Sequence, residues 1–394
     1  MSEPVRLVPD AERRARMARR HGIAPRHRLA DPVAATRAMT VLHSTEPPTP
    51  YLSVHARVDG MTRADLDRAL YDDRSLVKQL AMRRTLFVFP RDLLPAAWGS
   101  ASARVALIER RRIAKDVEKA GIAADGDAWL DAARARVLAH LDEHPEGLPA
   151  REVGRLFPEL ATPVDVSAGS LWNHTRLLTH LGLTAHLVRG RNGGHWRISR
   201  PVWVPMAGWL GEEPVPLAPE EGYAALVARW LRTFGPGTET DVVWWLGATK
   251  GAVRRALADL GALPVALESG DTGWLLPDDL EPEPPVEPWA ALLPVLDATL
   301  MGWKQRDWYL DPAHVPYLFD TNGNGGTTAW WDGRVVGCYV QDGAGTVHVV
   351  LREDPGADAR AALDVEAERL TAWLAGESVN SVYASRQMRE ARLP

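Results

Sequence analysis

Residues 150–203 carry apolar positions first at helical spacing and then in short runs typical of strands. Residues 150–157 predict a short helix, and residues 167–181 predict a longer one. Ser167 is a residue type that caps helix starts, and Gly182 stands where a left-handed residue would end the longer helix. The apolar face expected for this helix consists of Leu171, Leu178 and Leu181. The pattern therefore predicts two helices joined by a turn.

A β-hairpin is predicted directly after these helices. Residues 184–188 and 195–199 are short strand-forming runs around the turn 189–194, which reads Arg-Gly-Arg-Asn-Gly-Gly. Two helices followed by a hairpin are typical of a winged-helix domain. Its second helix can fill a DNA major groove, and its hairpin, the wing, can contact phosphate.

A second unit of the same kind is predicted over residues 223–277. Its elements are helices 223–233, 239–246 and 250–260 and strands 263–267 and 274–276. Repeated modules of this type indicate a chain built to lie along nucleic acid.

A third, more diverged unit is predicted in the N-terminal part of the chain. Residues 11–20 form a basic helical stretch, and Asp31-Pro32 marks the start of a helix that we expect to reach about residue 42. The remaining predictions are helices over residues 62–71, 75–82 and 94–119 and a strand over residues 85–89.

The pattern changes again near the C-terminus. Residues 330–339 and 345–352 predict strands with turns at Asp332-Gly333 and Asp342-Gly343, and residues 358–374 predict a helix. The expected fold class is α+β, with tandem winged-helix domains followed by a β-rich C-terminal domain. The expected domains are residues 1–125, 126–215, 216–285 and 286–394.

The composition gives no sign of a membrane span and excludes an internal disulfide. No run of about 18 apolar residues predicts a membrane span, and the single cysteine, Cys338, excludes an internal disulfide. We expect a cytoplasmic monomer. Residues 1–40 hold nine Arg against four acidic residues, whereas residues 256–303 hold nine acidic residues and no Lys or Arg. The net charge of −5 is therefore a poor guide to DNA binding, and local patches matter more.

Several segments together resemble the AlkZ/YcaQ group of winged-helix DNA glycosylases. The matching segments are Leu42-His43-Ser44-Thr45, Ala56-Arg57-Val58, residues 82–88, residues 171–203 and residues 331–337. The resemblance covers residues 29–394. It implies tandem winged helices closing round duplex DNA and excision of alkylated purines, including bulky and crosslinked adducts, without a metal.

The catalytic motif is where this chain departs from the family it resembles. The family carries Gln-x-Gln or Gln-x-Asp where this chain has His43, Ser44 and Thr45. A neutral His43 could accept a proton from water, Thr45 could orient that water, and Glu46 is the nearest carboxylate. We expect these three residues to be catalytic. The alternatives are polar contacts at a helix end for His43 and Thr45 and a helix-ending role for Glu46.

Basic and polar side chains from several modules are expected to contact DNA. One of the arginines in the first module could instead form a buried pair with a carboxylate, and the polar side chains at the start of the second helix could face solvent. The expected contacts are Arg57, Arg83, Arg84, Asn173, His174, Arg176, Arg189, Arg191 and Arg334.

The leading hypothesis is a monofunctional DNA glycosylase that hydrolyses the N-glycosidic bond of N7-substituted purines in double-stranded DNA. A purine alkylated at N7 carries a positive charge and leaves without a general acid, so the enzyme has only to stabilise the sugar cation and place a water. The twelve histidines show no metal-ligand spacing, and we expect neither metal nor cofactor. The alternatives are a non-catalytic DNA-binding regulator or lesion sensor and, because of the acidic segment 256–303, a partner-binding protein.

Overall fold

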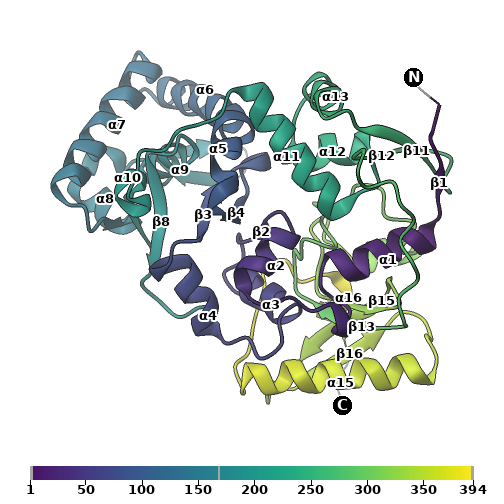
Figure 1. The fold of residues 1–394 in the computed structure, drawn as a ribbon. Helices are drawn as coiled ribbons and strands as arrows, with labels where there is room; N and C mark the ends of the chain where they lie inside the picture. Colours follow the sequence, from purple (N-terminus) through teal and green to yellow (C-terminus); the bar gives the residue numbers. More distant parts are fainter. Residues whose placement is uncertain (1–2, 167–168, 392–394) are drawn as a thin grey trace. The chain divides into compact units, whose positions relative to one another are not determined.

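The computed structural model describes residues 3–166 and 169–391 and has a mixed α/β architecture (Figure 1). The chain folds into two compact units. Unit 1 spans Met1–Leu66 and Val227–Pro394, and unit 2 spans Asp67–Leu226. The first and last segments of the sequence therefore pack together in unit 1. The finer division into four domains stays a prediction.

Unit 2 contains helices and three small antiparallel groups of strands. The helices are α5 (Leu94–Ala97), α6 (Ala103–Lys119), α7 (Gly126–Glu143), α8 (Ala150–Leu156), α9 (Asn173–Leu183) and α10 (Met206–Leu210). The strands are β3 (Leu76–Leu80), β4 (Leu86–Pro90), β5 (Leu148–Pro149), β6 (Pro163–Val166), β7 (Gly169–Trp172), β8 (Leu187–Asn192) and β9 (Pro201–Pro205). β3 pairs with β4, β6 pairs with β7, and β5, β9 and β8 form one sheet in that order.

The core of unit 2 lies where α6, α7, α8 and α9 meet the β8–β9 hairpin. Val117, Val137, Leu181 and Trp203 are buried in one apolar cluster. Apolar side chains recur along the helices at spacings of three and four residues, which places them on the face that packs inward. This core fixes the base of the hairpin that the sequence pattern predicts as a wing.

Four sequence expectations for unit 2 were wrong in detail. Residues 75–82 contain a strand, β3, because β4 supplies a non-local pairing partner that overrides the helical spacing. The second helix begins at Asn173, after the β6–β7 hairpin, and the proposed cap Ser167 lies outside the described residues. Gly182 lies inside this helix, and the left-handed residue after it is Ala185. The wing strands begin and end later than expected, at residues 187–192 and 201–205.

In unit 1, the predicted elements of residues 223–277 are confirmed almost residue by residue. They are α11 (Pro219–Phe234, whose first half belongs to unit 2), α12 (Glu239–Leu246), α13 (Lys250–Asp259), β11 (Leu263–Leu267) and β12 (Thr272–Leu275). Thr238 forms a capping box with Asp241 at the start of α12, and Gly247 ends that helix in the left-handed conformation. The short strands β1 (Leu7–Val8) and β10 (Gly237–Thr238) complete the sheet β1-β11-β12-β10.

The C-terminal part of unit 1 is a four-stranded antiparallel sheet with a helix against it. Its strands are β13 (Ala290–Leu293), β14 (Thr328–Trp331), β15 (Arg334–Gln341) and β16 (Val347–Leu351). Asp332 and Gly333 both have positive φ, as the predicted two-residue hairpin requires. α15 (Ala357–Leu374) lies along this sheet (Figure 1), and α14 (Val315–Leu318) and α16 (Arg386–Glu390) are short.

The N-terminal segment of unit 1 alternates short helices with turns. It contains α1 (Asp10–Arg20), α2 (Pro32–Ala38), β2 (Leu42–His43), α3 (Thr49–His55) and α4 (Arg63–Asp67). Asp31 caps α2 by accepting the Ala34 N–H at 2.8 Å, as predicted. The helix was expected to reach residue 42, but it ends at Ala38 because Thr40 adopts a positive φ. Among the described residues, no helix is long and apolar enough to cross a membrane.

Candidate catalytic turn and DNA contacts

Three of the four residues at the turn between β2 and α3 are polar and buried, and the fourth is exposed. His43, Ser44 and Glu46 are 6%, 4% and 7% exposed, whereas Thr45 is open to solvent. Pro47, Pro48 and Pro50 cannot donate backbone hydrogen bonds, and they separate this turn from the body of α3. The alternative in which Glu46 only ends a helix is wrong, because Glu46 precedes α3 and its carbonyl accepts the Thr49 N–H.

The Glu46 carboxylate is held by the segment between α15 and α16. Ser381 donates its hydroxyl to Glu46 Oε1 at 3.1 Å, and the Val382 N–H donates to the same oxygen at 3.0 Å. Hydrogen bonds to a carboxylate stabilise its ionised form. Burial raises the pKa of the nearby Tyr383 hydroxyl, and the charge of Glu46 raises it further. The sequence gives no signal for Ser381, which lies 335 positions from Glu46.

A pocket of about 260 Å³ lies in unit 1 beside this contact. Pro48 and Leu52 of α3 line one side, and Ser381 and Ala384 of the C-terminal segment line another. Leu370 and Leu374 of α15 and residues of β15 also line it. The glutamate therefore lies near a hollow whose lining mixes apolar side chains with hydroxyls.

Arg57 was expected to contact DNA, and the structure instead supports the alternative of a buried ion pair. Its side chain is fully buried and pairs with the fully buried carboxylate of Asp297. The Nη1–Oδ2 and Nη2–Oδ1 distances are 2.9 and 2.7 Å. Ser53 and Thr299 donate to the same carboxylate through Oγ and the backbone N–H. A guanidinium with this partner and no solvent contact has no group left for phosphate.

The three residues at the start of α9 that were expected to contact DNA lie in different surroundings. Asn173 is 1% exposed, so it does not lie on a solvent-facing surface as expected. Arg176 donates to Asp116 of α6 at 2.6 Å and its side chain is 9% exposed. His174 is half-buried. Arg176 therefore ties α9 to α6. The side-chain amide of Asn173 is buried without a hydrogen-bond partner among the described residues, so neither residue presents itself to a groove.

Arg83 and Arg84 form the tight turn that joins β3 to β4. Both have positive φ and both are exposed. Arg84 donates to Glu109 of α6 at 3.0 Å, while half of its side chain stays open to solvent. These two arginines therefore project from the end of a hairpin, where a phosphate could reach them.

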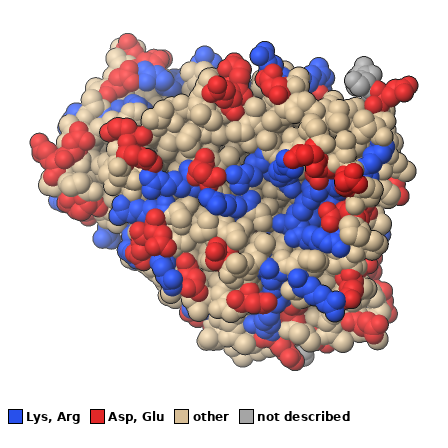
Figure 2. Space-filling model, in the orientation of Figure 1, with Lys and Arg blue, Asp and Glu red and all other residues tan. Residues whose placement is uncertain are grey.

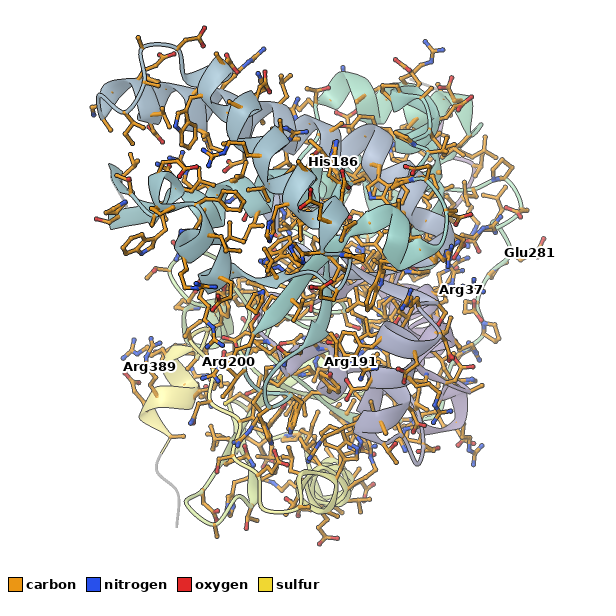
Figure 3. All side chains as sticks on the ribbon, turned by 90° about the vertical axis from the view of Figure 1, so that its left-hand side faces the viewer. Arg37, His186, Arg191, Arg200, Glu281 and Arg389 are labelled. Atoms are coloured by element: carbon orange, nitrogen blue, oxygen red, sulfur yellow. The ribbon has the colours of Figure 1, made fainter. Side chains whose placement is uncertain are left out.

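The wing places its arginines at different depths. Arg189 was expected at the tip, but it lies within β8 opposite Trp203 and is half-buried. Arg191 is exposed and pairs with Asp72. Arg200, which the sequence pattern did not single out, is exposed at the start of the returning strand. Figure 3 shows Arg191 and Arg200 at the end of the hairpin that is remote from His186.

In unit 1, Arg334 is exposed at the first position of β15. The preceding Gly333 packs directly against Arg14 of α1, where a Cβ would approach the Arg14 side chain to 2.7 Å. Figure 2 shows basic side chains gathered over α1 on this face, interspersed with acidic ones. Arg334 thus starts its strand beside a mixed patch of charge.

Among residues 3–166 and 169–391, no three His, Cys, Asp or Glu side chains are grouped so that they could hold a metal ion. The single thiol, Cys338, is buried in β15, and burial raises its pKa to about 12. The polar groups available to the candidate turn are thus hydroxyls, an imidazole and one carboxylate.

Comparison with known proteins places this geometry in a family. A solved structure, the Streptomyces sahachiroi DNA glycosylase AlkZ, superposes with a TM-score of 0.73 at 20% sequence identity, covering 93% of this chain and 97% of that one. Among curated proteins, none matches the sequence. The family model described as DNA glycosylase AlkZ-like matches residues 36–373, which is most of the chain. The protein therefore belongs to the AlkZ-like DNA glycosylase family.

Proposed function

We propose that this chain removes N7-alkylated purines from double-stranded DNA by hydrolysing the N-glycosidic bond, with catalysis centred on the turn from His43 to Glu46. Family membership supports DNA glycosylase activity, and the printed name of the structural relative is that of a DNA glycosylase. The observation that carries the proposal is the buried, doubly hydrogen-bonded carboxylate of Glu46 at the end of this turn.

Glu46 supplies the negative charge that the reaction needs. Departure of a cationic purine leaves an oxocarbenium-like sugar, and a fixed carboxylate in a site with little water stabilises developing positive charge strongly. Among the described residues, both hydrogen bonds to this carboxylate end on Oε1. The second oxygen, Oε2, is then the one that can face the sugar or accept a hydrogen bond from the attacking water.

His43 and Thr45 complete the proposed site with weaker groups than the amides or carboxylate typical of the family. A neutral imidazole at His43 can accept a proton from water, and the exposed hydroxyl of Thr45 can orient that water. Because Ser44 and Thr45 carry no charge, the field at the sugar depends on Glu46. The proposal therefore assigns the largest effect on rate to Glu46.

The DNA contacts proposed are those whose side chains remain accessible. They are Arg83, Arg84, His174, Arg189, Arg191 and Arg334. We propose winged-helix modules as their scaffold and a cytoplasmic monomer acting on duplex DNA. With phosphate contacts of this kind, the logarithm of the binding constant falls linearly with the logarithm of the salt concentration.

Base release from a defined lesion tests this function. A labelled duplex with one N7-methylguanine is incubated with the chain in the presence of EDTA, and the free base and the abasic site are measured. We expect both products in equal amounts, with strand cleavage only after alkali. No free base from this duplex or from one bearing a bulky N7 adduct would overturn the proposal.

The departure of His43-Ser44-Thr45 from the family motif favours one other function, a lesion sensor that binds without catalysis. A sensor would bind the alkylated duplex more tightly than the undamaged one and release no base. The same experiment, read together with binding affinities for both duplexes, separates the two functions.

A further inference from the structure

Two cationic side chains in unit 2 lie side by side without a counter-ion. Lys78 is on β3 and Arg189 is on the neighbouring β8, and both are half-buried. Within the described parts of the chain, neither forms an ion pair with a carboxylate, whereas the other arginines of unit 2 that pair with one include Arg84, Arg110, Arg176 and Arg191. Buried charges are ordinarily paired, because removing a charge from water is costly.

The immediate neighbours of these two cations are aromatic and offset only part of this cost. Lys78 donates to the Tyr71 hydroxyl at 2.8 Å, and its Nζ lies 5.2 Å from the centre of the Tyr71 ring. The Arg189 guanidinium lies 5.1 Å from the centre of the Trp203 ring, and its buried Nε has no hydrogen-bond acceptor among the described residues. A ring face attracts a cation but carries no net negative charge.

Both side chains have a lowered pKa, because holding their charged forms in this buried place is unfavourable. Burial and, after it, the charge of Arg189 lower the pKa of Lys78 to about 8, while the charge of Asp67 opposes the shift. Burial alone lowers the pKa of Arg189 to about 10. The free protein therefore keeps two positive charges together at a cost in stability, which is a pattern that natural proteins keep chiefly at functional sites.

We propose that Lys78 and Arg189, with the rings of Tyr71 and Trp203 beside them, form a preformed binding site for a phosphate of the DNA backbone. The guanidinium of the exposed Arg191 lies 5.3 Å from the centre of the same Tyr71 ring that Lys78 contacts, so the site continues into the basic end of the hairpin. Figure 2 shows further basic side chains over β3 and β8. A doubly hydrogen-bonded phosphate oxygen supplies the missing negative charge.

This inference depends on the proposed function only in taking DNA as the polyanion. It assigns a role to Lys78, the charged residue of the strand β3, and it moves Arg189 from the tip of the hairpin to a fixed site within β8. A purely structural role makes the opposite prediction for stability, because removal of a structural contact destabilises the fold.

The test uses the full chain, an undamaged fluorescent duplex of about 20 base pairs, and the variants Lys78→Met, Arg189→Met and their double. Methionine keeps the length and apolar contacts of each stem. We expect each single variant to bind about tenfold more weakly, and the double variant to lower the slope of log K against log salt by about one. The thermal midpoint of each variant without DNA should equal or exceed that of wild type.

Arg110→Met is the matched control, because it removes the same charge from an arginine of unit 2 that already pairs with Asp127 and Asp131. Lys78→Arg keeps the charge and should bind like wild type, which guards against a folding defect. Binding and salt slope in the Met variants equal to those of Arg110→Met would overturn the proposal. Loss of base release by Glu46→Gln bears on the catalytic assignment alone, since this assay needs no catalysis.

Discussion

Arg57 and Asp297 form a fully buried, bidentate ion pair that joins α3 to the loop after β13, 240 positions away along the chain. Thr299 extends the contact, because its hydroxyl accepts from Arg57 Nη2 at 2.8 Å and lies 2.9 Å from Nδ1 of the buried His21. This network ties the N-terminal segment of unit 1 to its C-terminal part. It explains why an arginine inside a family-like segment is not available to DNA.

Breaking this pair should cost much stability and little DNA affinity. Arg57→Met leaves the Asp297 charge buried without its partner, so we expect the free energy of unfolding to fall by about 3–5 kcal/mol. Urea denaturation measures this loss. The double variant Arg57→Met/Asp297→Leu should recover most of it, and the salt dependence of duplex binding should stay at the wild-type slope. A reduced slope for Arg57→Met in its folded state would instead mean that Arg57 contacts phosphate.

Within unit 1, arginines of the basic N-terminal segment form ion pairs with carboxylates of the acidic segment 256–303. The basic helix α1 packs against the acidic segment that follows β12: Arg16 and Arg20 both donate to Asp279, at 2.9 and 2.7 Å, and Arg19 donates to Glu283 at 3.1 Å. The two opposite charge runs are thus each other's partners, and the excess of arginine in residues 1–40 is not a DNA-binding surface by itself.

We therefore expect Asp279→Asn to act on the fold. Two arginines lose a shared carboxylate, and Arg16 is almost fully buried, so unfolding should become easier by about 1–3 kcal/mol. Thermal or urea unfolding measures the change, with Asp354→Asn as a control at an exposed pair. Equal stability of the two variants would show that the α1 contact contributes little.

His55 makes unit 1 sensitive to acid. Burial and the charges of Arg369 and Arg28 lower its pKa from 6.5 to about 3. Between these values the folded chain binds fewer protons than the unfolded chain, so the contribution of His55 is complete above pH 6.5 and falls as the pH drops toward 3. His55→Phe keeps the ring contact with Trp373 and removes the titration.

The measurement for His55 is the free energy of unfolding at about pH 7 and about pH 4.5. We expect the wild-type protein to lose more stability over this interval than His55→Phe does. His144→Gln, at an exposed histidine, serves as the control. Parallel losses in wild type and His55→Phe would contradict the assignment.

Lys78 gives a pH dependence of the same sign as His55, but in the alkaline range. Its pKa of about 8 in the folded chain lies below its usual 10.5, so the folded chain binds fewer protons between these values. On this account stability rises with pH across that window. Arg189 from β8, Asp67 from α4 and the Tyr71 hydroxyl are the groups that face the ammonium.

We expect Lys78→Met to melt at a higher temperature than wild type at about pH 7.5, and the difference to shrink by about pH 9.5. Differential scanning calorimetry at both pH values measures it. A difference that stays constant, or a variant that melts lower at both values, would show that the ammonium is not a burden to the free protein.

Local sequence signals predicted elements well where the fold uses local chemistry. Residues 239–246 begin at the Thr238 capping box and end at Gly247, and both signals are visible in the sequence. The turn at Asp332-Gly333 is equally local. Residues 75–82 were misassigned because the pairing of Leu76–Leu80 with Leu86–Pro90 outweighs their helical spacing.

The sequence indicated the candidate turn, but it did not indicate the residues that contact it. The resemblance pointed to Leu42–Thr45, and Glu46 followed as the nearest carboxylate, but no periodicity or spacing links Glu46 to Ser381 or Arg57 to Asp297. Such partners are chosen by packing over hundreds of residues. For the same reason the sequence allowed a buried arginine pair in the first module without showing that Arg57 forms it, and it did not show the burial of Asn173 and Arg176.

The rate of base release by Glu46→Gln tests the central claim most directly. The single-turnover rate on an N7-methylguanine duplex is compared with that of wild type and of Glu287→Gln, a variant at an exposed ion pair. The account predicts a fall of about 100-fold or more for Glu46→Gln, with duplex affinity within about twofold of wild type. An unchanged rate for Glu46→Gln would contradict it.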